Sequence, residues 1–251
     1  MPGVHLLLVA AGARLAVIPG LHSLEVSVRK ALSLGAAALL VLTLAAPVAA
    51  DDFSQGASVN AAPNWKVYNY NPSGQAYATS VATFSSAGIG FDFLSAPNTA
   101  FFMTSQQKDL LGNLTGKTIT ATFTIQGSTD AAFTYYGAPG ACGLKGPNVR
   151  LFFEGNMTGP LDYANYWWSN PYSATLASLV GNTVTLIVPI NPGKWSDWNG
   201  QWGTTVPDGF AAAAADVSTI GLSFGGGCFF ANGVGVSSGN ASFVLTSYAV
   251  N

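Results

Sequence analysis

The strictest pattern in this chain is an alternation of side chains across residues 117–126. Even positions from 118 to 124 all carry threonine, whereas the odd positions carry Ile119, Ala121, Phe123 and Ile125. Successive side chains of a strand point to opposite faces of its sheet, so a period of two predicts a strand with one buried face. A chain built from such segments folds as an all-β protein.

Shorter segments with β-type alternation recur along the chain. Strands are predicted at residues 65–70, 76–84, 89–94, 100–104, 117–126, 131–136, 148–154, 183–190, 220–224 and 241–250. One short helix is predicted at residues 207–216, with Asp208 as its N-cap. Short strands with turn residues between them and a single helix predict an antiparallel β-sandwich, or jelly roll, as one domain over residues 51–251.

The first 50 residues predict a leader that precedes this domain. Arg29 and Lys30 come before an apolar run over residues 31–46, and small residues end the segment at Ala50. This order is typical of a secretory signal peptide cleaved after Ala50. The alternative, a membrane anchor, is disfavoured because a bilayer span takes about 20 apolar residues. We therefore expect a secreted protein with no membrane span after cleavage.

The composition after the leader excludes several classes of function. Both histidines, His5 and His22, lie in the leader. Ser-His-Asp and Cys-His catalytic arrangements are therefore impossible after cleavage, and the usual zinc sites lose their commonest ligand. The nine basic residues fall to six and the eleven acidic residues to ten, so no basic patch remains for nucleic acid. No phosphate-binding Gly-x-x-x-x-Gly-Lys motif is present.

The chain has two cysteines, Cys142 and Cys228. An even pair in an exported chain predicts a disulfide. Because it would close a long loop, it would stabilise the fold by about 4 to 5 kcal/mol in the chain-entropy model. We expect its role to be structural.

Several segments resemble secreted bacterial jelly-roll modules of the galactose-binding-like type. Residues 114–125, Leu-Thr-Gly-Lys-Thr-Ile-Thr-Ala-Thr-Phe-Thr-Ile, are similar to the first strand of many carbohydrate-binding modules, and residues 220–224 and 242–250 are similar to their last two strands. Residues 71–77 and 96–102 resemble segments of laminin-B-type domains. Many carbohydrate-binding modules hold a structural calcium through an acidic residue of the closing strand, whereas residues 246–249 are Thr-Ser-Tyr-Ala. The resemblance implies a glycan-binding sandwich, and we expect no cofactor; a structural calcium stays open, although the closing strand does not support it.

Aromatic side chains gather in two segments of the chain. A sugar ring packs its C–H face on Trp or Tyr, while nearby amides and carboxylates bond its hydroxyls. The predicted ligand-binding residues are Tyr166, Trp167, Trp168, Asp197, Trp198, Asn199, Gln201 and Trp202. Trp167 and Trp168 are neighbours and point to opposite faces of an extended segment, so we expect one in the core and the other accessible to a ligand. Trp195 favours a core position, and for Trp198 and Trp202 core and surface roles both stay open.

Carboxylates offer a catalytic alternative. Glycoside hydrolysis needs only two acids across a sugar-binding cleft. Glu154 is the only glutamate after the leader, and Asp162 and Asp197 flank the aromatic segments as candidate partners. Arg150 lies on the same alternating face as Glu154, so an internal ion pair between them is also expected.

These observations favour a secreted, monomeric protein that binds a polysaccharide or another glycan without catalysis. A structural or adhesive extracellular sandwich, whose aromatic residues mostly fill the core, is the alternative. A polysaccharide-active enzyme that uses Glu154 with an aspartate is a third hypothesis.

Overall fold

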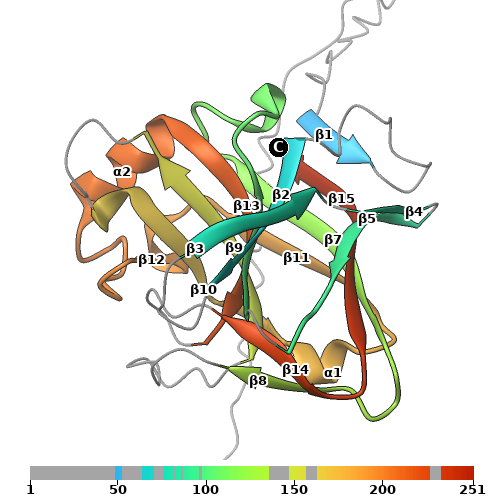
Figure 1. The fold of residues 1–251 in the computed structure, drawn as a ribbon. Coiled ribbons are helices and arrows are strands. Elements are labelled where there is room, and N and C mark those ends of the chain that lie inside the picture. Colours follow the sequence, from blue (N-terminus) through green and yellow to red (C-terminus); the bar gives the residue numbers. More distant parts are fainter. Residues whose placement is uncertain are drawn as a thin grey trace, which may run out of the picture. The chain divides into compact units, whose positions relative to one another are not determined.

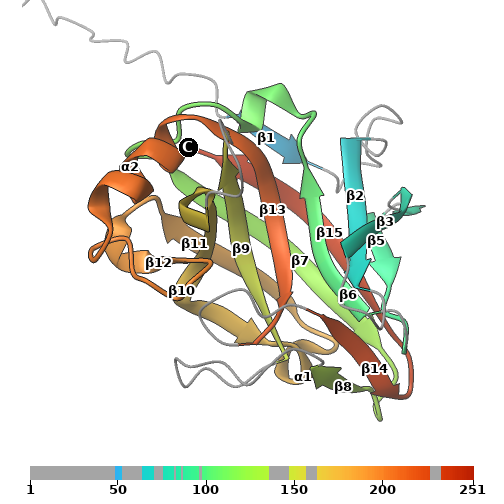
Figure 2. The same ribbon diagram turned by 60° about the vertical axis from the view of Figure 1, so that its left-hand side comes forward.

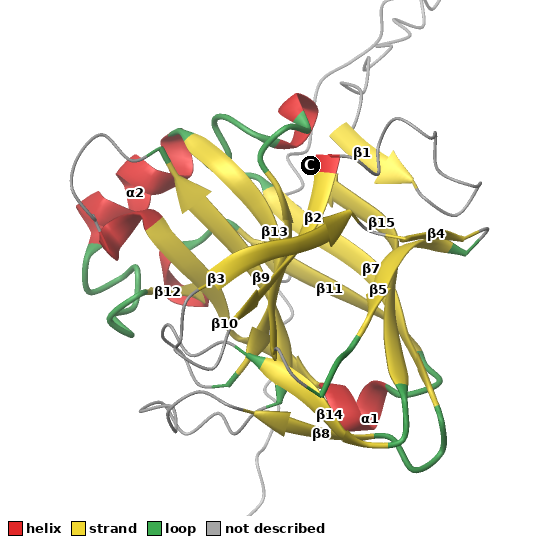
Figure 3. Ribbon diagram, in the orientation of Figure 1, coloured by secondary structure: helices red, strands yellow, loops and turns green. Residues whose placement is uncertain are grey.

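A computed structural model describes residues 49–52, 64–70, 76–81, 83–85, 87–95, 98–135, 147–156, 163–226 and 233–251. Strands account for most of these residues (Figure 3). All of them belong to one compact unit, Ala45–Asn251. Among them, no helix is both long enough and apolar enough to cross a lipid bilayer.

The first of two antiparallel sheets, called sheet A, has the strand order β11-β7-β15-β5-β4, with β1 also paired to β15 (Figure 1). Its strands are β1 (Ala49–Asp52), β4 (Thr83–Ser85), β5 (Gly88–Asp92), β7 (Thr118–Gly127), β11 (Thr183–Pro189) and β15 (Ala241–Val250). The predicted alternation of β7 is confirmed, because all four of its apolar side chains are fully buried. The threonines of β7 point to the other face of the sheet.

The second sheet, called sheet B, has the order β12-β10-β9-β13-β6-β14-β8, with β2 paired to β6 and β3 paired to β2. Figure 2 shows β9, β13 and β6 side by side at its centre. Its strands are β2 (Trp65–Tyr70), β3 (Ala76–Val81), β6 (Asn98–Thr104), β8 (Ala132–Tyr135), β9 (Asn148–Gly155), β10 (Tyr166–Thr175), β12 (Trp195–Asp197), β13 (Val217–Gly225) and β14 (Val234–Ser238).

The apolar core lies between the inner faces of the two sheets. Phe91 and Phe243 of sheet A contact Phe224 of sheet B, with ring centroids 5.4 Å and 5.2 Å apart. Trp65 of β2 packs on Tyr248 of β15 at 5.2 Å, so the contact between sheets extends along the closing strand. These contacts establish the predicted all-β antiparallel sandwich.

Short helices connect the strands: η2 (Lys108–Leu110), η3 (Tyr163–Asn165), α1 (Leu176–Leu179), η4 (Pro192–Lys194) and α2 (Pro207–Ala215). The structure thus has a second α-helix, α1, that was not predicted. In α2 the N-cap is Val206, so the prediction that Asp208 caps this helix is wrong. Pro207 suits the first helical position because it has no N–H to satisfy, and Asp208 instead lies in the first turn.

Most predicted strands are present, with small shifts at their ends. Residues 76–84 form two strands, β3 and β4, that belong to different sheets. Strands β1, β10, β12 and β14 were not predicted. The expected cleavage point after Ala50 falls within β1, where Ala50 pairs with Ala249 and Asp51 with Tyr248.

Candidate functional site

The outer face of sheet B, turned away from the core, carries a second apolar cluster. Ala100, Phe101, Phe152 and Trp168 are buried in it, and Tyr68, Met103, Tyr166 and Trp198 are partly buried against them. We call these eight residues the outer aromatic cluster. They come from β2, β6, β9, β10 and the turn after β12, so the cluster depends on the pairing of segments far apart in the sequence.

The rings of this cluster form a continuous row across the sheet. Phe101 contacts Phe152 at a centroid distance of 4.9 Å, and Phe152 contacts Trp168 at 5.2 Å. Trp198 then contacts Trp168 at 6.1 Å and Tyr166 at 5.4 Å. The row therefore runs from the buried rings of Phe101, Phe152 and Trp168 to the partly buried rings of Trp198 and Tyr166.

Polar contacts hold the buried end of this row. The Trp168 indole Nε1–H donates to Ser223 Oγ at 3.0 Å. The Arg150 guanidinium carbon lies 6.0 Å from the Trp168 ring centroid, a cation–π distance. Arg150 is fully buried, and desolvation lowers the pKa of its guanidinium, whereas the charge interaction with Tyr135 opposes this shift. The contact between Trp168 and Arg150 thus stabilises both of these buried side chains.

Gly221 of β13 lies opposite Phe152 on one neighbouring strand and Met103 on the other. A Cβ atom built at Gly221 would overlap the backbone carbonyl oxygen of Phe102 and come within 2.6 Å of Met103 Cα. Glycine therefore lets β13 and β6 approach closely under the outer face.

Glu154 of β9 also points to the outer face of sheet B. Its register partner on β10 is Tyr166, and Thr219 is its partner on β13. Burial raises the pKa of the Glu154 carboxyl, and hydrogen bonds from the Tyr166 and Thr219 side chains oppose that rise. Desolvation and the Glu154 charge raise the pKa of Tyr166 to about 12, so the phenol keeps its proton and donates to the carboxylate.

Two adjoining hollows open near this end of sheet B, and Glu154 lines the smaller one. The smaller, of about 170 Å³, is lined by Asn64, Lys66, Tyr68, Met103, Ser105, Gln106, Glu154 and Thr219. The larger, of about 630 Å³, is lined by Ser105, Lys108, Leu111, Gly112, Asn156, Asp216, Val217, Ser218 and Thr219. Because the two hollows share Ser105 and Thr219, we treat them as one feature, the sheet-B groove.

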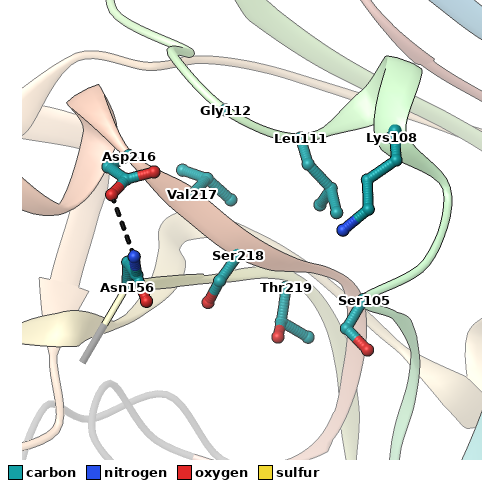
Figure 4. A pocket seen from close by; sticks show the side chains of 9 residues that line it. All are labelled: Ser105, Lys108, Leu111, Gly112, Asn156, Asp216, Val217, Ser218 and Thr219. Carbon is teal, nitrogen blue, oxygen red and sulfur yellow. Dashed lines mark hydrogen bonds between the residues drawn. The ribbon is translucent and has the colours of Figure 1, made fainter. Parts of the chain in front are cut away.

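Figure 4 shows the larger hollow of the groove. Lys108 and Leu111 reach into it from the segment after β6, while Asp216 and Asn156 lie on the opposite wall. Asn156 Nδ2 donates to Asp216 Oδ2 at 3.1 Å. Ser218 donates its hydroxyl to the carbonyl oxygens of Glu154 and Gly155, at 3.3 Å and 3.1 Å. The lining is thus rich in hydroxyl, amide and charged groups.

Three of the predicted binding residues come together in the outer aromatic cluster: Tyr166, Trp168 and Trp198. Trp168 is nevertheless fully buried, so the expectation that one ring of its pair is accessible is wrong. Trp167 lies in the core, 4.9 Å from the Phe210 ring. Trp195 is in the core as predicted, and its indole N–H donates to the Pro189 carbonyl at 2.9 Å.

The remaining predicted residues lie in the turn after β12. Asp197 is buried, and its Oδ1 accepts the backbone N–H groups of Asn199 and Gln201 at 2.9 Å and 2.7 Å. Asp197 therefore shapes the turn, and burial raises the pKa of its carboxyl while these hydrogen bonds oppose the rise. Asn199 and Gln201 are exposed. Trp202 is partly buried, forms a bridge with Ser196, and is not part of the cluster.

The sheet register separates Glu154 from Asp197, one of its two candidate catalytic partners. Asp197 pairs with Trp167 on the core side of sheet B, whereas Glu154 pairs with Tyr166 on the outer side. Glu154 and Asp197 therefore do not face a common cleft. Arg150 and Glu154 do share a face, but four strand residues span about 13 Å, too far for the expected ion pair. Asp162 lies outside the described residues.

Sequence reasoning missed most of the groove. Lys66 and Tyr68 carried a signal, since they alternate with the buried Trp65 and Val67 and so had to point outward. The segment after β6 and the start of β13 gave no comparable signal, because only the pairing of β6 with β13 brings them together.

The predicted disulfide between Cys142 and Cys228 lies outside the described residues. Within the described part of the chain, no three His, Cys, Asp or Glu side chains gather as they would around a metal ion. The sequence matches no family model, and no curated protein is similar to it.

Proposed function

We propose that this chain is a non-catalytic carbohydrate-binding protein that holds a saccharide on the outer face of sheet B. The observation that carries the proposal is the position of partly exposed rings beside a polar groove. Tyr68 belongs to both the outer aromatic cluster and the groove lining, and Tyr166 bonds Glu154 in the groove wall.

The two parts of this face match the two sides of a sugar ring. Aromatic rings suit the C–H face of a pyranose, and hydroxyl and amide groups suit its equatorial hydroxyls. Tyr68 and Trp198 supply rings that are partly open to solvent. Ser105, Gln106 and Thr219 supply polar groups in the groove. The resemblance to carbohydrate-binding modules agrees with this assignment, as does the leader, which implies export to the extracellular space.

A structural or adhesive role is the second candidate. It is favoured by the burial of Trp65, Trp167, Trp168 and Trp195, all of which are fully enclosed. These rings stabilise the sandwich and leave less aromatic surface for a ligand.

A depletion assay of the purified protein against soluble and insoluble polysaccharides separates these two candidates. The variants are Tyr68→Ala and Trp198→Ala on the proposed face, with Trp202→Ala as the matched control. Binding lost in the first two variants and kept in the control supports the proposal. Loss in Trp202→Ala alone moves the site to the turn after β12, and no binding across the panel favours the structural role.

A further inference from the structure

We propose that the sheet-B groove selects saccharides that carry negative charge, in the form of carboxylate or sulfate groups along the chain. This inference rests on the proposed function and adds a ligand class to it. The charged groups of the groove differ in whether other groups of the protein already engage them.

The basic side chains of the groove are available. Lys66 lies on β2 opposite Met103, and Lys108 begins η2 just after the end of β6, so pairing of β2 with β6 brings both to the same end of the sheet. Lys66 lines the smaller hollow and Lys108 the larger. Among the described residues, neither ammonium group makes a hydrogen bond or an ion pair.

The acidic side chains of the groove are engaged by internal donors. The Glu154 carboxylate accepts hydrogen bonds from Tyr166 and Thr219 and is partly desolvated. The Asp216 carboxylate accepts from Asn156 at 3.1 Å. Because both carboxylates already accept hydrogen bonds within the protein, they have fewer free lone pairs that could accept hydrogen bonds from a ligand. The formal charges of the groove cancel, but its two ammonium groups have no partner among the described residues, whereas its two carboxylates already accept hydrogen bonds. The lysines are therefore the charged groups most available to a ligand.

General attraction between the protein and polyanions does not account for such selection. Residues 51–251 contain ten acidic and only six basic side chains, so this part of the chain repels polyanions as a whole. The lysine ammonium group is a point charge and lacks the planar guanidinium of arginine, so it pairs with carboxylate and with sulfate groups alike. Selectivity for charge, rather than for one type of anionic group, is thus the expected behaviour.

The test is titration calorimetry of the purified protein with polygalacturonate, dextran sulfate and neutral dextran, each at low and moderate ionic strength. The variants are Lys66→Gln/Lys108→Gln and a charge-matched control, Lys117→Gln/Lys194→Gln, whose residues do not line the groove. We expect binding of an anionic polymer that weakens with salt and falls about tenfold in the groove variant, since exposed ion pairs of lysine contribute only modestly to affinity.

Each outcome decides the question. An anionic polymer bound by the control variant and lost by the groove variant supports the inference, and the polymer concerned identifies carboxylate or sulfate as the partner group. Equal binding of neutral dextran without salt dependence overturns the charge selection and leaves the proposed function standing. Equal weakening in both lysine variants also overturns it, and a protein that binds no saccharide loses both proposals.

Discussion

The outer faces of the two sheets differ although both come from strands with buried inner faces. On sheet A the outward side chains of β7 and β11 are mostly threonines, two pairs of which bond one another, with the exposed Ile187 beside them. Thr122 and Thr185 share a hydrogen bond of 3.0 Å, and Thr124 and Thr183 share one of 2.9 Å. One hollow on this sheet, of about 150 Å³, is similar in volume to the smaller hollow of the sheet-B groove and much smaller than the larger one, and its Asp92 accepts a hydrogen bond from Ser242 at 2.6 Å.

On sheet B the outward side chains include many large and aromatic ones, together with short residues of β13 such as Thr219 and Ser223. Rings over β6, β9 and β10 project from the sheet, and the groove forms beside them. The size of the outward side chains, rather than the inner pattern, thus distinguishes the two outer faces. Small hydroxyl groups satisfy each other on a flat face, whereas large rings leave space between them.

The largest expected effect is on stability, from Trp168→Ala. This substitution removes a fully buried ring that contacts Phe152, Trp198 and Arg150. Loss of a buried Trp costs about 3 to 5 kcal/mol, so urea unfolding should show a decrease of this size. Thr185→Ala on sheet A is the control and should change the unfolding free energy by less than about 0.5 kcal/mol. If the two variants lost similar amounts of unfolding free energy, the outer faces of the two sheets would not differ in their contribution to stability.

A smaller loss is expected for Gly221→Ala. The added methyl group would overlap the backbone of β6, and overpacking of this kind costs about 1 to 3 kcal/mol. Thermal unfolding measures the effect. Gly112→Ala is an informative second variant, because nothing lies within 4 Å of its Cβ position and only its positive φ of 87° opposes the change. If Gly221→Ala is as stable as the wild type, β13 and β6 are less closely packed than described.

Glu154→Gln should change how stability depends on pH. Because burial raises the pKa of Glu154, the folded chain binds a proton more tightly than the unfolded chain. Between the ordinary glutamate pKa of about 4.3 and the raised value, the unfolding free energy should therefore fall as pH increases. Glutamine removes this contribution, whereas the raised pKa of Asp197 acts in both proteins. Urea unfolding from pH 4 to 7 should show the variant gaining stability relative to the wild type, and a constant difference would contradict the assignment.

The smallest effect is expected for the double change Thr122→Val/Thr185→Val on sheet A. It removes both partners of an exposed hydrogen bond, which is close to neutral, so the unfolding free energy should shift by no more than about 0.5 kcal/mol. Saccharide binding should not change, because this face is not the proposed site. A variant that loses binding would show that sheet A takes part after all.

The sequence predicted the strands whose alternation is strict, and missed those where it is broken. β7 and β2 were found because buried and outward side chains alternate without interruption. β10 was missed because Asn170 and Pro171 interrupt it, and its register shifts between Trp168 and Ser173. β14 is short and directly follows Gly233, and a glycine at the start of a segment predicts a turn rather than a strand. In the structure Gly233 has a positive φ of 118°.

The candidate site was predicted only in part, for a related reason. Alternation alone correctly separated Trp167 from Trp168, because it needs no knowledge of neighbouring strands. The groove requires the order of β2, β6, β13 and β9 in the sheet, and this order depends on contacts far apart in the sequence. Its lining from Ser105 and Lys108 therefore had no local signature.

The glycine at position 221 has a consequence for how relatives of this chain could be recognised. Aromatic residues of the outer cluster can exchange with one another during evolution while the face keeps its character. No other residue can replace a glycine whose Cβ would overlap a neighbouring backbone without moving that strand. In divergent homologues, a glycine at the centre of the strand opposite Phe152 should persist longer than the tryptophans, and it would mark descent after the ligand preference has changed.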